Sequence, residues 1–273
     1  MRIAHLSDLH FGHHDPALAT DLAADVEAQK PSLVVVSGDF TQRGTRVEFE
    51  QAQKFLAELA SPVFAVPGNH DVPAKDITAR LLHPYRLYKT YISPELEPFI
   101  EIDDVAIAGL KTARRARFEL NWAHGTIDHA QLNRLATTFR KASPSATRIV
   151  VAHHPLLIPE GTMQVEMHPA RKATAALRAF HELGVRAVLS GHFHLSYVRT
   201  HAVEVSAGAP EIADGTPIPP ILLVQASSTI STRLRGEPNA YNLIDIDAGR
   251  MSVVVRERVG TAWVTREKLS AQS

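Results

Sequence analysis

Two histidines one residue apart, His192 and His194, follow the apolar run "VRAVLS". Imidazole is a common ligand of divalent metal ions, so the pair predicts part of a metal site if other ligands lie close by. Ligands of open α/β sheets bind beyond the carboxyl ends of the strands, so motifs that follow strands are expected to meet in one crevice. Four more polar motifs follow apolar runs in this way: "SDLH" (7–10), "GDF" (38–40), "GNHD" (68–71) and "AHHP" (152–155).

The motifs contain carboxylate, imidazole and amide groups, a donor set suited to Mn, Fe or Zn. In an extended chain residues i and i+2 point the same way, so Asp8 and His10 are expected to reach one ion. Two divalent ions about 3.5–4 Å apart, sharing one carboxylate, would use every candidate and would activate a water for in-line attack on a phosphate ester. The seven candidate ligands are Asp8, His10, Asp39, Asn69, His153, His192 and His194.

The series D-x-H, GD, GNHD, H-x-P and GHxH resembles the calcineurin-like metallophosphoesterase superfamily. The motifs occur in the family's order and span residues 8–194. The GNHD form is similar to the branch of class III cyclic-nucleotide phosphodiesterases and glycerophosphodiesterases. The resemblance implies a four-layer α/β/β/α sandwich of two packed mixed sheets flanked by helices.

The resemblance also implies a role for each motif residue. His70 is similar to the family's histidine that faces the substrate and stabilises or protonates the leaving oxygen, so His70 and Asp39 are the implied catalytic residues. In "AHHP" the family's ligand is the histidine two before the proline, which is His153 rather than His154. The first ion would be held by Asp8, His10, Asp39 and His194. The second would be held by Asp39, Asn69, His153 and His192, with Asp39 bridging.

Substrate contacts are expected from residues beside these motifs. His13 and His14 follow the first metal motif, and His154 stands beside the ligand within "AHHP". Arg114 is one of several arginines whose guanidinium groups match phosphate oxygens. Solvated surface positions are the alternative for the arginines. The other arginines considered are Arg115, Arg117, Arg233 and Arg235.

Short apolar runs alternate with stretches of helical period, which predicts a layered α/β protein. We expect residues 1–273 to form a single domain, in which the strands of residues 221–269 build a second, more antiparallel sheet. Helical faces are readable around Phe49, around Leu177, and after the capping pair Asp128 and Gln131. The strand candidates are "RIAHLS", "SLVVVSG", "PVFAVPG", "DVAIAGL", "RIVVAHH", "VRAVLSG", "ILLVQAS", "YNLIDID" and "MSVVVRERV".

Residues 72–100 are a candidate cap or lid. Within residues 76–92, Leu81, Tyr85 and Tyr88 share a stripe, and Pro84 should kink or break the helix. The segment is either a helix packed at the edge of the domain or a lid beside the metals that covers a nucleobase or an acyl chain.

Composition excludes some classes of function. Basic and acidic residues are equal in number, 29 of each, which argues against a nucleic-acid partner. Cysteine is absent, so disulfides and thiolate ligands are excluded. The N-terminus lacks a signal-peptide pattern and the apolar runs are too short to span a bilayer, so we expect a cytoplasmic protein. Peripheral membrane association stays open, and an uncovered edge of the C-terminal strands could pair two copies.

These observations favour a dinuclear metal-dependent phosphodiesterase that acts on a small phosphodiester, such as a cyclic nucleotide or a glycerophosphodiester. The alternative within hydrolases is a pyrophosphatase acting on a nucleotide-linked lipid such as UDP-2,3-diacylglucosamine. A catalytically silent scaffold of the same fold is the alternative outside the hydrolases. The sequence leaves open the native substrate, the native metals and the oligomeric state.

Overall fold

The computed structural model describes residues 1–114, 124–159, 167–203 and 219–266. The strands are β1 (Arg2–Leu6), β2 (Leu33–Val36), β3 (Val63–Ala65), β4 (Phe99–Ile102), β5 (Val105–Leu110), β6 (Thr147–Ala152), β7 (Val185–Ser190), β8 (Tyr197–His201), β9 (Ile221–Gln225), β10 (Ala240–Asp247), β11 (Arg250–Val259) and β12 (Ala262–Thr265). The helices are α1 (Pro16–Ala28), α2 (Arg46–Ala57), α3 (Ile77–Leu82), α4 (Arg86–Tyr91), α5 (His129–Phe139) and α6 (Ala173–Glu182).

The strands form two mixed sheets of six strands each. The first sheet has the order β12-β11-β10-β1-β2-β3, in which β1, β2 and β3 are parallel and β10 runs antiparallel to β1. The second has the order β4-β5-β6-β7-β9-β8, with β5, β6, β7 and β9 parallel and antiparallel strands at both edges. The parallel strands of each sheet therefore bring the loops after them to one end of that sheet.

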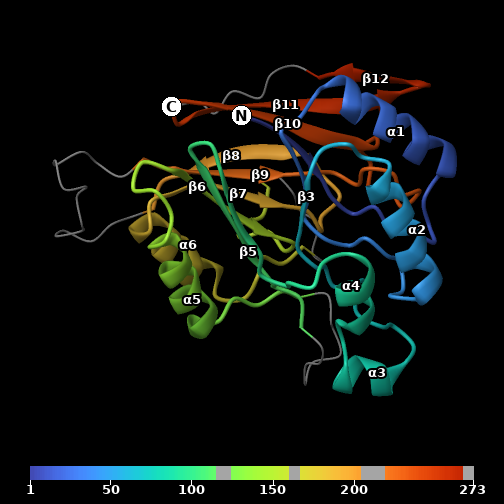
Figure 1. Ribbon diagram of the computed structural model, residues 1–273, viewed down its shortest axis with the longest axis horizontal. Helices are drawn as coiled ribbons and strands as arrows, with labels where there is room; N and C mark the ends of the chain where they lie inside the picture. Colours follow the sequence, from blue (N-terminus) through green and yellow to red (C-terminus); the bar gives the residue numbers. More distant parts are fainter. Residues whose placement is uncertain (115–123, 160–166, 204–218, 267–273) are drawn as a thin grey trace.

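Three buried clusters fill the spaces between four layers. One contains Leu22 of α1 and Phe49 of α2 with residues of β1 and β2, and another contains Phe180 of α6 with residues of β5 and β6. The third lies between the two sheets and joins Val35 of β2 with Ile149 of β6. Figure 1 shows α1 and α2 on one side of the paired sheets and α5 and α6 on the other. The predicted four-layer α/β/β/α sandwich is confirmed.

The expected grouping of the C-terminal strands is wrong. Residues 221–269 do not build the second sheet together, because β9 pairs in parallel with β7 whereas β10 pairs with β1 of the first sheet. The first sheet is thus made from both ends of the sequence and the second sheet from its middle. Alternating hydrophobicity identifies a strand but not its partner, since partner choice depends on contacts between distant segments.

All nine strand candidates form strands, whereas β4, β8 and β12 were not anticipated. These three are edge strands of the two sheets, and their partial exposure weakens the apolar pattern. Helix α1 was also missed, although Asp15 caps its first turn and Pro16 occupies its first position, a recognised start signal. The capping pair of α5 is confirmed, because Asp128 and Gln131 form a reciprocal capping box.

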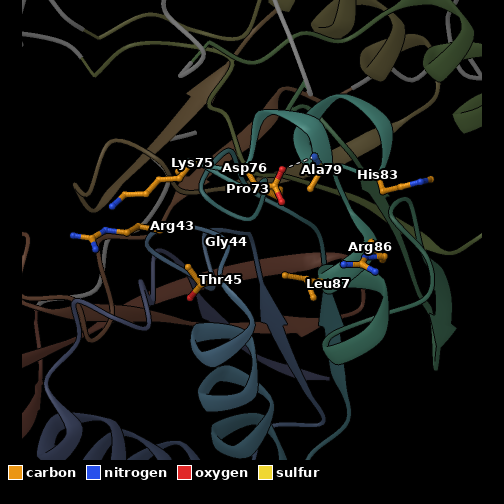
Figure 2. Close-up of a pocket in the computed structure, with 11 residues that line it drawn as sticks. Arg43, Gly44, Thr45, Pro73, Lys75, Asp76, Ala79, His83, Arg86 and Leu87 are labelled. Carbon is orange, nitrogen blue, oxygen red and sulfur yellow. Dashed lines mark hydrogen bonds between the residues drawn. The ribbon is translucent and has the colours of Figure 1, made fainter.

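The segment of residues 72–100 contains α3 and α4, which are separated around Pro84 as expected. Tyr85 and Tyr88 are buried, and the Tyr88 ring lies 5.9 Å from that of Phe40, so α4 packs on the core at the edge of the domain. Leu81 was expected on the same buried stripe but is exposed, because α3 projects beyond this core. Instead, α3 lines a cavity of about 240 Å³ (Figure 2). In the described ranges no helix combines the length and apolar character needed to cross a membrane.

Candidate metal centre

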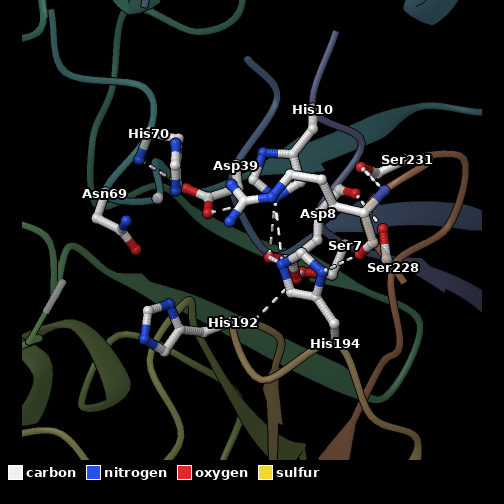
Figure 3. A network of polar contacts seen from close by, with 12 residues as sticks. Ser7, Asp8, His10, Asp39, Asn69, His70, His192, His194, Ser228 and Ser231 are labelled. Atoms are coloured by element: carbon white, nitrogen blue, oxygen red, sulfur yellow. Dashed lines mark hydrogen bonds and ion pairs between the residues drawn. The ribbon is translucent and has the colours of Figure 1, made fainter. Parts of the chain in front are cut away.

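The five polar motifs meet where the carboxyl ends of the parallel strands of both sheets lie together. His194, after β7, places Nε2 3.2 Å from Asp8 Oδ1, after β1. His153, after β6, places Nε2 3.2 Å from Oδ2 of Asp39, after β2. Figure 3 shows His194 and Asp8, which follow strands of different sheets, turned toward one another, with His10 and Asp39 beside them. The predicted convergence is therefore present in the fold.

The donor atoms form overlapping groups, in each of which they lie within 4.8 Å of one another. Asp8, His10 and His194 make one group, while Asp39 and His153 join Asp8 in a second. Asn69 adds an amide oxygen 3.1 Å from His153 Nε2. His192 belongs to a further group with His153 and His154. The arrangement has the form of two adjacent ligand sets that share carboxylates.

The backbone at the ligands is not extended as expected. Five of the seven candidates have a left-handed backbone: φ is 52° at Asp8, 50° at His10, 55° at Asp39, 74° at His192 and 58° at His194. Such a conformation is strained for residues other than glycine and is found where the surrounding structure and function require it. The chain turns sharply at these five ligands, so their side chains converge by turning and not by the alternation of a strand.

Contacts between the motif loops hold these turns. The amide of Asp8 donates to the Gly38 carbonyl at 3.0 Å, and the amide of His192 donates to Asp8 Oδ2 at 2.8 Å. Glycine is needed where two loops touch: a β-carbon at Gly68 would overlap Asp39, and one at Gly191 would overlap Asp8. The glycines of "GNHD" and "GHFH" therefore make space for the carboxylates.

The electrostatics of the centre depend on buried ion pairs. Burial alone would raise the pKa of the Asp8 carboxyl, but His194 and His10 outweigh it and hold that pKa well below its usual range. Burial likewise opposes ionisation of His153, yet the Asp39 carboxylate raises its pKa to about 9. No carboxylate of the described residues forms an ion pair with His192, and burial lowers its pKa to about 3. Both carboxylates are thus anionic at neutral pH.

The residues fit divalent metal ions. His153 Nδ1 lies 2.9 Å from the Ser37 carbonyl and His194 Nδ1 lies 3.0 Å from the Arg233 carbonyl, so each Nδ1–H donates outward. In the neutral ring this leaves the Nε2 lone pair directed into the centre, the tautomer that a metal ligand needs. Asp8 Oδ1 is buried and, although His194 Nε2 is 3.2 Å away, it accepts no hydrogen bond from the described residues. A cation would satisfy that oxygen and separate the Nε2 atoms of His10 and His194, which lie 3.2 Å apart.

His70 stands at the side of this centre. Its amide donates to Asp39 Oδ1 at 2.8 Å, and its ring lies 4.9 Å from the His10 ring. Nδ1 lies 2.7 Å from the Gln42 carbonyl and donates to it, so Nε2 is the free nitrogen. His70 thus has the same outward Nδ1 hydrogen bond as His153 and His194, and it forms a further donor group with His10 and Asp39.

Asp71 of "GNHD" was not assigned a role from the sequence, and the structure gives it one. Its carboxylate accepts from the Thr41 amide at 3.0 Å and from the Gly68 amide at 2.9 Å. Burial and the nearby Asp39 carboxylate raise the pKa of Asp71 to about 7. Asp71 thus ties the "GNHD" loop to the loop after β2.

Hydroxyl groups near Asp8 were also missed. Ser7 Oγ donates to Asp8 Oδ2 at 2.7 Å, and Ser228 Oγ donates to the Asp8 carbonyl at 2.9 Å. Ser7 belongs to "SDLH", so its place beside the ligand was a readable signal. Ser228 follows β9, far away in the sequence, and no local pattern marks it.

The expected substrate contacts divide into two groups. His154 is buried at the centre: its ring lies 4.5 Å from that of His192 and its Nδ1 2.7 Å from Thr112 Oγ1. His13 instead contacts Thr232 Oγ1 at 2.9 Å, and the ring of His14 packs against Phe11.

Arg114 is used elsewhere in the fold. Its Nη2 donates to Asp128 and Gln131 at the start of α5. No contact among the described residues links Arg114 with the candidate metal centre. Arg115 and Arg117 lie outside the described residues. Arg233 contributes its carbonyl to His194, while Arg233 and Arg235 are exposed.

Residues 1–196 match the calcineurin-like phosphoesterase family. The chain belongs to this family. It is 28% identical over 260 residues to the cAMP/cGMP dual specificity phosphodiesterase of Mycobacterium tuberculosis, which covers 89% of this chain and 75% of that protein. It is 37% identical over 82 residues to the glycerophosphodiester phosphodiesterase of Enterobacter lignolyticus, which covers 26% of this chain and 30% of that one.

A solved structure shares the fold of this calcineurin-like phosphoesterase. The crystal structure of a dimetal phosphatase from Danio rerio matches with a TM-score of 0.64 and 14% identity, over 97% of this chain and 98% of that chain. The recognition of the family from its motifs is confirmed, and a phosphoester hydrolase is the activity that the family supports.

Proposed function

We propose that the protein is a dinuclear metal-dependent phosphodiesterase that hydrolyses a small phosphodiester, with cyclic nucleotides and glycerophosphodiesters as the nearest analogues. The observation that carries the proposal is the convergence of two buried carboxylates with imidazole Nε2 atoms whose opposite nitrogens donate to backbone carbonyls. Membership of the family and similarity to phosphodiesterases support it. We place the protein in the cytoplasm, in agreement with the sequence expectation.

In this proposal the seven candidate residues hold two divalent ions, Mn, Fe or Zn. Asp8, His10, Asp39 and His194 hold the first, and Asp39, Asn69, His153 and His192 hold the second. Bound ions of this kind supply Lewis-acid chemistry and an activated water for attack on phosphorus. Outward hydrogen bonds orient the imidazole ligands, and most of the ligand side chains are buried from solvent.

His70 assists the leaving group. Because Nδ1–H is donated to the Gln42 carbonyl, Nε2 carries a proton only in the imidazolium form. In that form Nε2–H can donate to the oxygen that departs from phosphorus, and the neutral ring remains after transfer. The fixed orientation of the ring avoids the entropy cost of positioning the proton donor.

The first prediction tests this function with bis(p-nitrophenyl) phosphate and supplied Mn²⁺. We expect His70→Ala to lower kcat by about 10²–10⁴-fold while metal content stays at that of wild type. Asp39→Asn should lower both metal content, measured by elemental analysis, and turnover. His129→Ala, at an exposed position on α5, serves as the control. Wild-type protein with fewer than two ions, or a His70→Ala variant as fast as wild type, would contradict the mechanism.

One observation favours a second candidate substrate, a nucleotide-linked lipid. Three large aliphatic side chains are exposed on or at the start of α3, Ile77 at 63%, Leu81 at 46% and Leu82 at 66%. Such residues could contact the acyl chains of a lipid substrate. A turnover panel of cyclic AMP, a glycerophosphodiester and UDP-2,3-diacylglucosamine decides between hydrolysis of a phosphodiester and of a pyrophosphate. A silent scaffold would cleave none of the three.

A further inference from the structure

A cavity of about 240 Å³ lies between the loops that follow the "GDF" and "GNHD" motifs. The first loop contributes Arg43 and Thr45, the second contributes Pro73 and Lys75, and helices α3 and α4 close the other side. In Figure 2, Arg43 and Lys75 extend toward the same side of the cavity, while His83 and Arg86 lie on the opposite side. The cavity therefore has an apolar interior of proline, alanine and leucine between two basic rims.

Basic side chains outnumber acidic ones in the lining of the cavity. Arg43, Lys75 and Arg86 form no ion pair with a carboxylate in the part of the chain that the structure describes. The lining contains one carboxylate, Asp76, whose Oδ1 accepts the Ala79 amide at 2.8 Å as the cap of α3. Three cations against one anion leave an excess of positive charge that an anionic ligand would neutralise.

The walls of the cavity are held in place before any ligand arrives. The amide of Ala74 donates to the Arg43 carbonyl at 3.0 Å, which joins the two loops. Arg80 is buried and donates through Nη1 to the Pro73 carbonyl at 3.0 Å. Gly44 has a φ of +68° and approaches the backbone of Val72 so closely that a β-carbon would collide with it. A fixed cavity loses little entropy on binding.

Both loops that line the cavity begin next to His70. His70 Nδ1 is held by the carbonyl of Gln42, whose next residue is Arg43 on the cavity wall. The "GNHD" loop runs from His70 through Val72 to Pro73 and Lys75 on the opposite wall. The cavity wall therefore begins within a few residues of His70 on the one loop and next to its hydrogen-bond partner Gln42 on the other.

We propose that this cavity binds the leaving group of the substrate and selects one that carries a second anionic substituent, a carboxylate or a phosphate, on a compact body. The proposal rests on the proposed phosphodiesterase function and names its specificity. Arg43 and Lys75 contact the anionic substituent, Arg86 adds to the field from the opposite rim, and the apolar interior accommodates the body. Asp76 opposes binding of the anion and limits its strength.

The second prediction compares two chromogenic esters on the metal-loaded enzyme: bis(p-nitrophenyl) phosphate and its analogue with a carboxylate on each ring. The measured quantity is kcat/KM for the carboxylated ester divided by kcat/KM for the parent ester. We expect the double variant Arg43→Ala, Lys75→Ala to lower this ratio by about tenfold, mainly through a higher KM for the carboxylated ester. Asp76→Asn keeps a capping side chain and should raise the same ratio. Arg178→Ala, at an exposed site on α6, is the matched control and should leave the ratio unchanged.

Each outcome of this experiment decides the proposal. A ratio that is unchanged in the double variant, or one that moves in the same direction in Asp76→Asn, overturns it. The proposal is also wrong if the cavity binds a separate anion. In that case inorganic pyrophosphate will change turnover of the parent ester in wild type but not in the double variant. The ratio of the two kcat/KM values will then be the same in both proteins. If wild type cleaves neither ester, the proposed function fails and the cavity proposal fails with it. Thermal unfolding of each variant confirms that it is folded.

Discussion

His5 is a buried residue of β1 that supports the centre from behind. Its Nδ1 lies 3.3 Å from the side-chain nitrogen Nδ2 of Asn242. Because Nδ2 can only donate, Nδ1 accepts, and Nε2 carries the hydrogen and donates it to Ser37 Oγ at 3.0 Å. The carbonyl of Ser37 in turn accepts from His153. Complete burial lowers the pKa of His5 to about 3, so the ring stays neutral at physiological pH. The neutral imidazole of His5 thus holds Ser37, whose carbonyl orients the candidate ligand His153.

The third prediction concerns the pH dependence of stability through His5. In the unfolded chain His5 takes up a proton near pH 6.5, whereas in the folded protein it does so only near pH 3. Between these values the unfolded state binds more protons, so the free energy of unfolding falls as pH falls, by up to about 1.4 kcal/mol per pH unit from this group. His5→Gln removes that contribution, so its stability should decline less steeply from pH 6.5 to pH 4.5.

Urea unfolding at several pH values measures this slope. His129→Gln, on the exposed side of α5, is the matched histidine control and should retain the wild-type slope. The lower stability of His5→Gln at pH 7.5 does not enter the comparison, because the prediction concerns the change with pH. Parallel curves for wild type and His5→Gln between pH 6.5 and pH 4.5 would show that His5 is not held neutral by burial.

At the residue scale the sequence predicted which side chains gather but not how. Asp8, Asp39 and His194 could be named because each stands in a polar motif directly after an apolar run. Their left-handed backbone could not be predicted, since it is set by contacts such as that between the Asp8 amide and the Gly38 carbonyl of another loop. His5 was assigned only to the first strand, because its partner Asn242 lies at the other end of the chain.

Two of the three tyrosines at α4, one just before the helix and one within it, have hydroxyl groups in opposite situations. Tyr85 donates its hydroxyl to the Ala113 carbonyl at 2.7 Å in a buried position. Tyr88 is completely buried, and its hydroxyl has no hydrogen-bond partner within the described ranges. An unpaired buried polar group costs about 1–3 kcal/mol, whereas a paired one stabilises. One short segment therefore contains both a stabilising and a destabilising hydroxyl.

The fourth prediction uses these tyrosines as a matched pair. Tyr88→Phe should raise the free energy of unfolding by about 1 kcal/mol, because it removes an unpaired hydroxyl and leaves the packed ring against Phe40. Tyr85→Phe should lower it by a similar amount, because the Ala113 carbonyl loses its donor. Chemical denaturation of both variants measures the two changes. Equal destabilisation by both would mean that the Tyr88 hydroxyl has a role in the folded state.

At the element scale the sequence predicted buried strands well and edge strands badly. β2 and β6 read as continuous apolar runs because they are covered on both faces. β4 and β8 lie at the edges of the second sheet with every residue only partly buried, so their sequences lack a contrast between apolar and polar positions. The break at Pro84 was predictable because proline ends a helix locally, whereas the exposure of α3 depends on where the core ends.

At the scale of the whole molecule the candidate centre joins the two sheets. Asp8 and Asp39 follow strands of the first sheet, and His153 and His194 follow strands of the second. The sequence predicted the shared position of these motifs at strand ends but not that they come from different sheets, because the return of β10 to pair with β1 is a contact between the ends of the chain. Ions held here would connect halves that otherwise contact mainly through apolar side chains.

The last prediction follows from that connection. A ligand that binds only the folded state stabilises it by about 2.7 kcal/mol when its free concentration is 100 times its dissociation constant. Removal of metal with a chelator should therefore lower the midpoint of thermal unfolding by several degrees, and added Mn²⁺ should restore it. Asp39→Asn, which lacks the implied bridging carboxylate, should respond far less to either treatment. An unchanged midpoint in chelated wild-type protein would mean that no ion contributes to the stability of the joined sheets. The two buried carboxylates would then be satisfied by their histidine partners alone.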